Sequence, residues 1–350
     1  MNVQVAQRLC KLMVLAGMVA LPASWKALAA DAAGPYKIEQ QWKIGGDGGW
    51  DYLSVDPSTH LLYISRGSRV LAVDTTSGKV VSEIPGFKGV HGIVFDTAGK
   101  YGYISDGGGN TVHVFDRATR KVVAAVPAGT NPDGMVFEPV TRTVWAFNGR
   151  SKNVTVIDTS NNSVAATITL PGKPEFPVAD GTGTVFVNIE DTSQMVRLDA
   201  KTLKATETWS LKPCDSPSGM AIDVKHRRLF SVCDGKKMVV VNADSGQVIA
   251  TPDIGEGPDA AGFDPGHQLA FSSNGEGTLT VVHEDSPDKY SVIQNLATQR
   301  GARTMTFDPS SGKIYLVTAQ FGPRPAPTPD NPWPRPAILP DSFVVLVVGR

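Results

Sequence analysis

The stretch GMVFEPVTRTVWAFNGRSKNVTVIDTSNNSVAATITL, residues 134–170, contains four short apolar segments separated by turns. Thr143–Asn148 is rich in β-branched and aromatic residues, and Asn153–Asp158 alternates apolar and polar positions. Gly, Pro, Asn, Asp and Ser gather between the segments, as they do in tight turns. The stretch therefore predicts four short strands that form one antiparallel sheet.

The first strand of this unit, with the acidic residue that closes it, recurs along the chain. Seven segments align: Tyr52–Asp56, Gly92–Asp96, Gly134–Glu138, Phe176–Asp180, Gly219–Asp223, Ala260–Asp264 and Thr304–Asp308. The closing acids are 40, 42, 42, 43, 41 and 44 residues apart. This period, with four strands and no helix in each unit, predicts an all-β, seven-bladed β-propeller with four-stranded antiparallel blades.

The two ends of the repeat array are complementary. The seventh unit lacks a fourth strand, and a surplus strand, Tyr36–Ile44, precedes the first unit. We expect this N-terminal strand to complete the last blade beside Phe343–Val348. Closure of the ring would hide strand edges that are otherwise open to aggregation.

Residues 1–30 have the pattern of a secretion signal. Arg8 and Lys11 precede the apolar run Leu12–Leu21, which is too short to span a membrane, and Ala27–Ala29 offers a cleavage site between small residues. An N-terminal membrane anchor is the alternative. We expect residues 31–350 to form one propeller that is periplasmic or secreted, monomeric, and without a membrane span after cleavage.

Charge and cysteine content limit the partners and the redox setting. Loss of three basic leader residues changes the formal charge from −1 to 30 − 34 = −4. Such a chain is not expected to bind nucleic acid through electrostatics. Cys214 and Cys233 remain after cleavage, one before and one at the end of neighbouring strands of the fifth unit. Export and an even count favour a disulfide between them, with two separate thiols as the alternative.

The second strands carry a further recurring motif. Tyr63–Arg66 (YISR), Tyr103–Asp106 (YISD), Trp145–Asn148 (WAFN) and Phe271–Asn274 (FSSN) fall in register, and Ile157–Thr159 (IDT) follows downstream. These elements resemble the YVTN-repeat β-propellers, a family that includes YncE-like secreted proteins. The resemblance covers roughly residues 36–350 and implies a secreted seven-bladed propeller. It does not imply one reaction.

Two sets of equivalent residues are predicted at one mouth of the central channel. The first set, which we call the rim residues, stands five positions before each closing acid: Asp51, His91, Asp133, Glu175, Ser218, Asp259 and Arg303. The second set stands about ten positions after it: Arg66, Asp106, Asn148, Glu190 or Asn188, Cys233, Asn274 and Thr318. Equivalent positions converge on the ring axis, so we expect carboxylates, two arginines and a histidine to lie close together.

Three interpretations of this polar mouth remain open. It can hold a small polar ligand or a peptide or protein partner, it can be a purely structural collar, or it can bind a hard divalent cation such as Ca²⁺ or Mg²⁺. We expect a binding or interaction module rather than an enzyme. The alternative is a metal-dependent, lactonase-like hydrolase or a quinone-type redox enzyme. His91 is suited to acid–base chemistry near neutral pH if its pKa is unperturbed.

A proline-rich insertion interrupts the last unit. Eight prolines lie within Phe321–Pro340, between its second and third strands. This density disfavours helix and sheet and favours extended polyproline geometry. We expect a semi-rigid flap over the mouth, in which Arg324 and Arg335 neutralise acidic rim residues and Trp333 is held on a stiff backbone. A disordered surface loop is the alternative.

Overall fold

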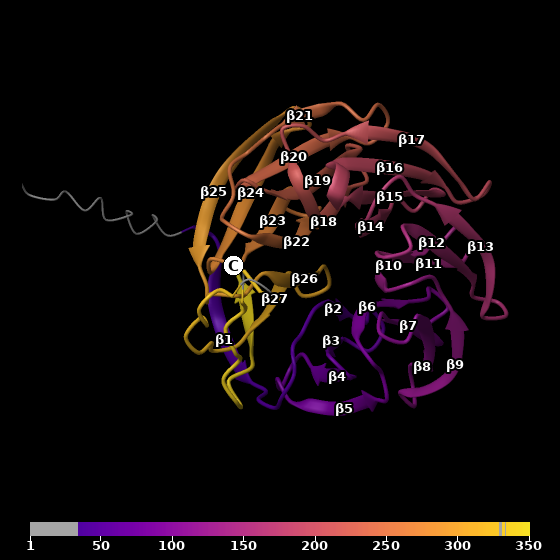
Figure 1. Ribbon diagram of the computed structural model, residues 1–350. Coiled ribbons are helices and arrows are strands. Elements are labelled where there is room, and N and C mark those ends of the chain that lie inside the picture. The colour runs from indigo at the N-terminus through magenta and orange to yellow at the C-terminus, as the bar shows by residue number, and fades with distance from the viewer. Residues whose placement is uncertain (1–33, 329–330, 333) are drawn as a thin grey trace, which may run out of the picture. The chain divides into compact units, whose positions relative to one another are not determined.

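The computed structural model describes residues 34–328, 331–332 and 334–350. In this part of the chain, seven four-stranded antiparallel sheets follow one another around a ring, with one short 3₁₀ helix, η1 (Glu190–Thr192). Figure 1 shows the ring viewed along its central axis. The predicted fold, a seven-bladed β-propeller, is confirmed. The predicted leader, residues 1–30, lies outside the described residues, as does Trp333.

The first six sheets are consecutive in the chain and run from the ring centre outward. Their strands are β2 (Leu53–Val55), β3 (Leu61–Arg66), β4 (Arg69–Asp74) and β5 (Val80–Pro85); β6 (Val90–Phe95), β7 (Tyr101–Asp106), β8 (Thr111–Asp116) and β9 (Lys121–Pro127); β10 (Pro132–Glu138), β11 (Thr143–Asn148), β12 (Asn153–Asp158) and β13 (Ser163–Thr169); β14 (Pro174–Ala179), β15 (Thr184–Ile189), β16 (Gln194–Asp199) and β17 (Lys204–Ser210); β18 (Asp215–Asp223), β19 (Arg228–Asp234), β20 (Lys237–Asn242) and β21 (Val248–Ala250); β22 (Pro258–Asp264), β23 (Leu269–Asn274), β24 (Thr278–Ser286) and β25 (Lys289–Ala297).

The seventh sheet joins the two ends of the array, as predicted. It consists of β26 (Thr304–Asp308), β27 (Lys313–Thr318), β28 (Val344–Gly349) and, outermost, β1 (Lys37–Lys43). β1 pairs antiparallel with β28, with Trp42 opposite Val345. Just before β1, Tyr36 is buried and its ring meets that of Phe271 of the sixth blade edge-on, with centroids 5.3 Å apart. The N-terminal strand therefore contacts two blades.

Neighbouring blades pack through their apolar faces. Tyr63 of the first blade, for example, is fully buried against Phe95 and Phe115 of the second. Near the axis the innermost strands of neighbouring blades approach one another so closely that there is little room for side chains between them. A Cβ atom at Gly92 would lie 2.8 Å from the carbonyl oxygen of Asp133 in the next blade. The glycine that recurs in the first-strand motif is explained by this approach.

The acids that close the first strands are structural. Asp56 is fully buried, and its carboxylate accepts a hydrogen bond from the Ser58 amide at 2.9 Å. Arg117, one residue beyond β8 in the second blade, also donates to both Asp56 carboxylate oxygens. Each such acid thus shapes a turn, and a cation from the neighbouring blade neutralises this one.

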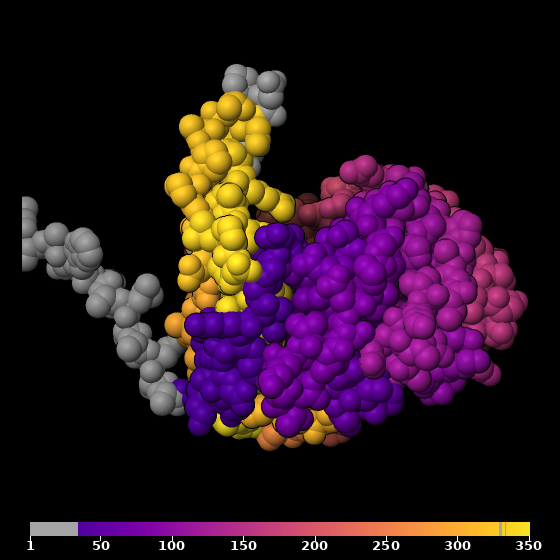
Figure 2. All heavy atoms as spheres, turned by 90° about the horizontal axis from the view of Figure 1, so that it is seen from below, coloured from indigo at the N-terminus to yellow at the C-terminus, as the bar shows by residue number. Residues whose placement is uncertain are grey.

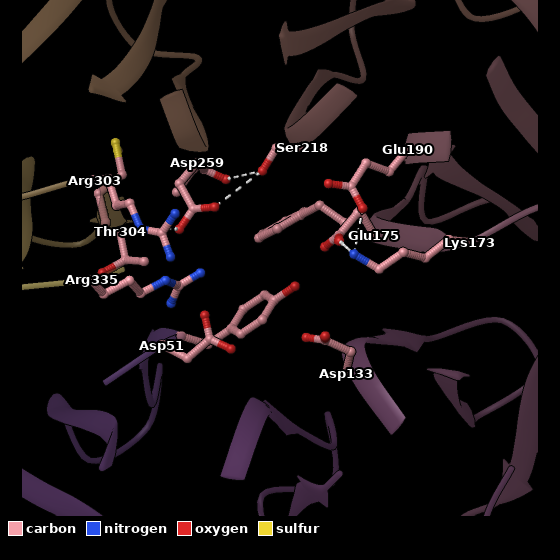
Figure 3. A pocket seen from close by; sticks show the side chains of 14 residues that line it. Asp51, Asp133, Lys173, Glu175, Glu190, Ser218, Asp259, Arg303, Thr304 and Arg335 are labelled. Carbon is pink, nitrogen blue, oxygen red and sulfur yellow. Dashed lines mark hydrogen bonds and ion pairs between the residues drawn. The ribbon is translucent and has the colours of Figure 1, made fainter. Parts of the chain in front are cut away.

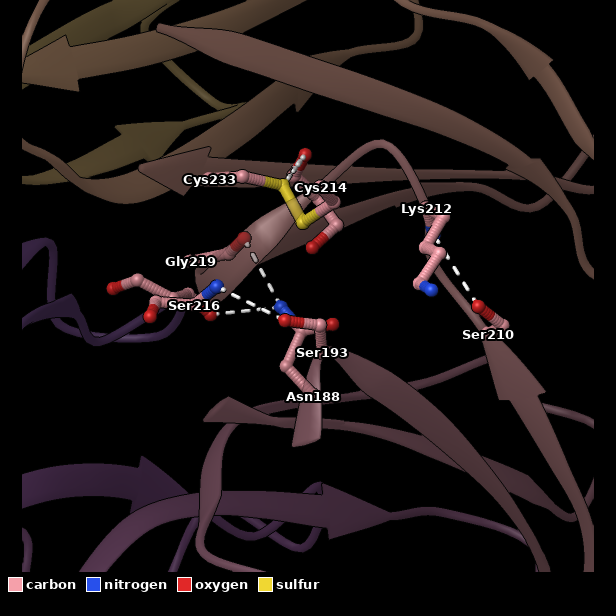
Figure 4. Close-up of a disulfide and its surroundings, with 10 residues drawn as sticks. Asn188, Ser193, Ser210, Lys212, Cys214, Ser216, Gly219 and Cys233 are labelled. Atoms are coloured by element: carbon pink, nitrogen blue, oxygen red, sulfur yellow. Dashed lines mark hydrogen bonds between the residues drawn. A yellow bond between two sulfur atoms is a disulfide. The ribbon is translucent and has the colours of Figure 1, made fainter. Parts of the chain in front are cut away.

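The predicted disulfide is present. Cys214 and Cys233 are bonded, with Cα atoms 5.5 Å apart, and both are fully buried (Figure 4). The bond ties the segment that leads into β18 to the end of β19. It fixes the start of the innermost strand of the fifth blade, on the side where the rim residues lie.

The proline-rich insertion leaves the last blade between β27 and β28 and projects from the body of the ring (Figure 2). Its base is paired: Phe321 and Ile338 form an antiparallel bridge, and Gly322 donates to the carbonyl oxygen of Ala337 at 2.8 Å. Phe321 packs against Trp50, with ring centroids 6.1 Å apart. The two segments of the insertion are therefore held together at its base, and the insertion is extended without forming a full sheet ladder. Among the described residues, no helix is long and apolar enough to cross a membrane.

Candidate functional site

The rim residues gather at one mouth of the ring (Figure 3). Six of them line a cavity of about 300 Å³, which we call the acidic pocket: Asp51, Asp133, Glu175, Ser218, Asp259 and Arg303. The seventh, His91, contacts Asp51 and Asp133 beside it. Each residue stands at or just before the start of an innermost strand, so the sevenfold repetition places them around one axis.

Arg66, from the second predicted set, does not line this pocket. Its side chain is fully buried, and its guanidinium donates to the carbonyl oxygens of Gly48 at 2.7 Å and Gly46 at 2.9 Å. It also lies over the ring of Phe343, 3.8 Å from the centroid. Arg66 therefore holds the glycine-rich segment before the first blade in place, and its cation is not available to a ligand.

Asp106, Asn148 and Asn274, from the same set, are also buried and do not line the acidic pocket. The Asp106 carboxylate accepts from the Lys88 amide at 3.0 Å. The Asn148 amide donates to Thr155 at 3.0 Å, and the Asn274 amide donates to Thr280 at 3.0 Å. These side chains turn back into their own blades because second and third strands leave unpaired polar groups at the connecting turns. That these side chains contact a ligand stays a prediction, and among the described residues they do not line the acidic pocket.

The fourth blade resolves the alternative between Asn188 and Glu190. Asn188 is buried and donates to the carbonyl oxygen of Ser218 at 2.8 Å. Glu190 begins η1 and lines the acidic pocket. The short helix therefore brings a carboxylate to the mouth.

A lysine bridges the carboxylates on this side of the pocket. Lys173 Nζ lies 2.5 Å from Glu175 Oε1 and also contacts Glu190 Oε2. Burial and the nearby charge of Asp133 raise the pKa of Glu175 to about 8, against the opposing effect of Lys173. The raised pKa means that the Glu175 carboxyl group holds its proton near neutral pH.

His91 connects the carboxylates of the first and third blades. Its Nδ1 lies 2.5 Å from Asp51 Oδ2 and 3.6 Å from Asp133 Oδ1. Burial opposes the charged imidazole, but the hydrogen bond with Asp51 and the charge of Asp133 together raise the pKa of His91 to about 9. His91 is thus a cation at neutral pH and not the neutral base that its unperturbed pKa suggests. The three donor atoms lie within 4.8 Å of one another, close enough to hold a divalent cation.

The opposite side of the pocket combines acid and arginine. The Asp259 carboxylate accepts from the Ser218 hydroxyl at 3.2 Å, and Arg303 Nε lies 3.3 Å from its other oxygen. Burial raises the pKa of Asp259 to about 6, although Arg303 acts in the opposite direction. Arg335 of the insertion points into the same pocket (Figure 3). Two aromatic rings, Tyr52 and Phe176, also line it.

A second cavity of about 350 Å³ adjoins the first, and we call it the arginine pocket. Its arginines are Arg300, Arg303, Arg324 and Arg335, and Trp50 and Phe321 supply aromatic surface. Arg303 and Arg335 line both pockets. No carboxylate is among the described residues that line the arginine pocket. The insertion therefore forms one wall of a basic pocket next to an acidic one.

The sequence analysis did not predict Lys173, Tyr52 and Phe176 as pocket residues, although each is unusual for its position in the repeat. Lys173 stands two positions before its rim residue, where the other blades have Gly49, Gly89, Asn131, Ser216, Gly257 and Gly301, so its charge is exceptional in the repeat. Tyr52 and Phe176 each follow a rim residue, at a position where the other blades have Gly, Ala or Thr. Nothing in the sequence shows that these two rings face each other.

Comparison with known proteins identifies the fold. The sequence matches no protein-family model and no curated protein. Among solved structures, the chain is similar to Kuenenia stuttgartiensis hydrazine synthase, with 15% identity, 78% of this chain and 94% of that chain covered, and a TM-score of 0.69. It is also similar to U3-55K, with 10% identity, 89% and 98% covered and a TM-score of 0.73, and to the RRP9 WD40 repeats, with 10% identity, 91% and 99% covered and a TM-score of 0.74. At these identities the chain shares with them the β-propeller fold.

Proposed function

We propose that this chain is a binding module for a small zwitterionic ligand, which carries an ammonium group and a carboxylate. The ammonium group lies in the acidic pocket and the carboxylate lies in the arginine pocket. The observation that carries this proposal is the direct adjacency of the two pockets through Arg303 and Arg335. Their volumes, about 300 and 350 Å³, are in the range of small-molecule sites.

The charged side chains of the acidic pocket support its assignment to the ammonium group of the ligand. The acidic pocket has five carboxyl groups, from Asp51, Asp133, Glu175, Glu190 and Asp259, of which Glu175 holds its proton near neutral pH, against three cations, from Lys173, Arg303 and Arg335. Within the described residues, the Asp133 side chain has no partner closer than His91 at 3.6 Å. Beside this long ion pair with His91, the Asp133 carboxylate can accept from an ammonium group, which the nearby Tyr52 ring also favours.

The arginine pocket supplies the complementary binding groups. Arg300, Arg324 and Arg335 form no ion pair with any other described residue, and all three side chains are exposed. A guanidinium binds a carboxylate with two parallel hydrogen bonds, so unpaired arginines next to aromatic surface favour such an anion. One ligand that spans both pockets satisfies the acids and the arginines together.

Titration calorimetry with free amino acids and dipeptides tests the proposal. A binder is expected to lose at least tenfold affinity in Asp133→Asn and in Arg300→Gln, while the exposed controls Glu83→Gln and Lys201→Gln bind as the wild type does. Amines without a carboxylate, and carboxylates without an amine, are expected to bind weakly. A ligand whose affinity is the same in both pocket variants would refute the assignment.

We further propose that the protein is exported and belongs with the YVTN-repeat propellers. The leader pattern of residues 1–30 and the in-register second-strand motifs support this, and a buried disulfide is typical of an oxidising compartment. Cell fractionation, with mass spectrometry of the mature N-terminus, is the test. Full-length protein that remains in the reducing cytoplasm would contradict it.

A further inference from the structure

A second cluster of ligand-type side chains lies between the fifth and sixth blades, away from the mouth residues. Asp223 ends β18, His226 lies in the turn that follows, and Glu284 belongs to β24. His226 Nδ1 is 2.7 Å from Asp223 Oδ2 and 3.1 Å from Glu284 Oε1. The Asp223 and Glu284 side chains are 4% and 0% exposed, and that of His226 is 19% exposed.

These close contacts do not satisfy the buried groups. Neither carboxylate oxygen of Glu284 has a hydrogen-bond partner of acceptable geometry among the described residues, and neither does His226 Nδ1. Asp223 Oδ1 accepts from the Lys225 amide at 2.9 Å, which leaves Oδ2 directed at the histidine. Buried polar groups are normally hydrogen-bonded, so the Glu284 carboxylate and His226 Nδ1, which lie beside Asp223 Oδ2 without a hydrogen bond of acceptable geometry, call for a shared partner.

In the second blade an arginine occupies the equivalent place. Glu284 and Arg117 are equivalent residues, because each directly follows the turn position at the end of the repeat's third strand. Both backbone amides donate across the turn. Glu284 N donates to Gln268 O at 2.9 Å, and Arg117 N donates to Lys100 O at 3.0 Å. Arg117 donates to the Asp56 carboxylate of the preceding blade. At the corresponding place, Asp223 of the preceding blade faces Glu284. A carboxylate therefore stands where the second blade has the neutralising cation.

We propose that Asp223, His226 and Glu284 bind a divalent first-row transition cation that takes the place of this missing positive charge. One imidazole nitrogen and two carboxylate oxygens suit Zn²⁺ or Mn²⁺, because imidazole disfavours Ca²⁺ and Mg²⁺. Ligand atoms at ~2.1 Å from such an ion lie ~3.0–3.4 Å apart, so the present spacing needs to open by only a few tenths of an ångström. Water completes the coordination.

The site is accessible and differs from the cluster at the mouth. Asp223 and Lys225 line a cavity of about 690 Å³, and the His226 side chain is partly exposed, so the cluster borders both the cavity and the surface. In the mouth cluster, His91 Nδ1 has a hydrogen-bond partner in Asp51 at 2.5 Å. The cation between the fifth and sixth blades is expected to link these two blades, and its role does not depend on the ligand proposed above.

Zinc binding by the purified full chain tests the proposal. After chelator treatment and dialysis, the protein is expected to bind one equivalent of Zn²⁺ in titration calorimetry, and its melting temperature is expected to rise by about 3 °C or more with the metal in excess. Glu284→Gln is expected to lose this binding at least tenfold. Glu284→Arg recreates the pair seen in the second blade and is expected to fold, to melt at or above the temperature of the metal-free wild type, and not to respond to Zn²⁺.

Two controls locate the effect. His267 makes the same i,i+3 contact with Asp264, at 2.8 Å, but no third candidate ligand joins them among the described residues, so His267→Gln is expected to bind Zn²⁺ normally. Asp133→Asn removes a donor of the mouth cluster and is likewise expected to retain the site. A wild-type protein that does not bind Zn²⁺ below millimolar concentration overturns the proposal. So does anomalous scattering that places the bound ion elsewhere, or unchanged binding in both Glu284 variants.

Discussion

The ring of Tyr52, in the first blade, stacks on the ring of Phe176, in the fourth, with centroids 5.4 Å apart and an interplanar angle of 24°. The first and fourth blades face each other across the ring, so this pair crosses the channel. Phe176 lines both the acidic pocket and the largely apolar cavity of about 690 Å³. The aromatic pair therefore lies at the boundary between the two cavities, and we call it the floor of the acidic pocket.

Removal of this floor is expected to weaken the fold and the site together. Tyr52→Ala should lower the free energy of unfolding by about 2 kcal/mol, somewhat less than truncation of a fully buried aromatic residue, because Tyr52 is only half-buried. Tyr52→Phe preserves the stack and should change stability by less than ~1 kcal/mol. Urea denaturation measures both. Equal stability of the two variants would show that the stacking contributes nothing.

The disulfide is expected to contribute to stability mainly by restricting the unfolded chain. Cys214 and Cys233 are 19 residues apart, and closure of a loop of this length contributes about 3 kcal/mol. The double variant Cys214→Ala/Cys233→Ala should unfold at correspondingly lower urea concentration, and reductant should have no further effect on it. If reductant leaves the wild-type transition unchanged while mass spectrometry shows free thiols, this contribution is absent.

The ion pair of His91 with Asp51 is expected to make stability depend on pH. Because the folded pKa is about 9 and the unfolded one is about 6.5, the stabilising contribution is complete below pH ~6.5 and disappears as the pH rises through about 9. The difference in unfolding free energy between wild type and His91→Gln should therefore shrink from pH 6 to pH 9.5. The exposed control Glu83→Gln should give a constant difference. A constant difference for His91→Gln as well would rule out the raised pKa.

The proline-rich insertion is expected to serve binding and not folding. Replacement of residues 324–336 by Gly-Gly keeps the paired base at Phe321 and Ile338 but removes Arg324 and Arg335 from the arginine pocket. The melting temperature should stay within about 2 °C of the wild type, and affinity for the zwitterionic ligand should fall at least tenfold. Arg335→Gln is the matched point variant and should show part of the loss. Wild-type affinity in the replacement variant would mean that the insertion does not contribute to the site.

Only part of the set of residues that line the mouth could be predicted from the sequence, because the repeat pattern does not show in which direction a side chain points. Asp51, Asp133 and Asp259 recur at one repeat position, and the ring symmetry alone brings them together. Arg66 was predicted there by the same argument, but it turns inward to five consecutive backbone carbonyl groups, those of Gly45 to Gly49. Repeat position determines where a Cα atom lies, whereas unsatisfied polar groups nearby determine where a long side chain points.

The amino-acid sequence was sufficient to predict the blades, their number, the closure of the ring and the pairing of Cys214 with Cys233. Strand alternation, turn residues and a fixed period are local signals, and seven such units leave few ways to bury their apolar faces. Three contacts could be recognised only in the folded molecule: Tyr52 meets Phe176, Lys173 joins Glu175 to Glu190, and Glu284 stands where another blade has Arg117. These relationships arise between blades that are distant in the chain, and their chemistry depends on distances and burial that no single repeat encodes.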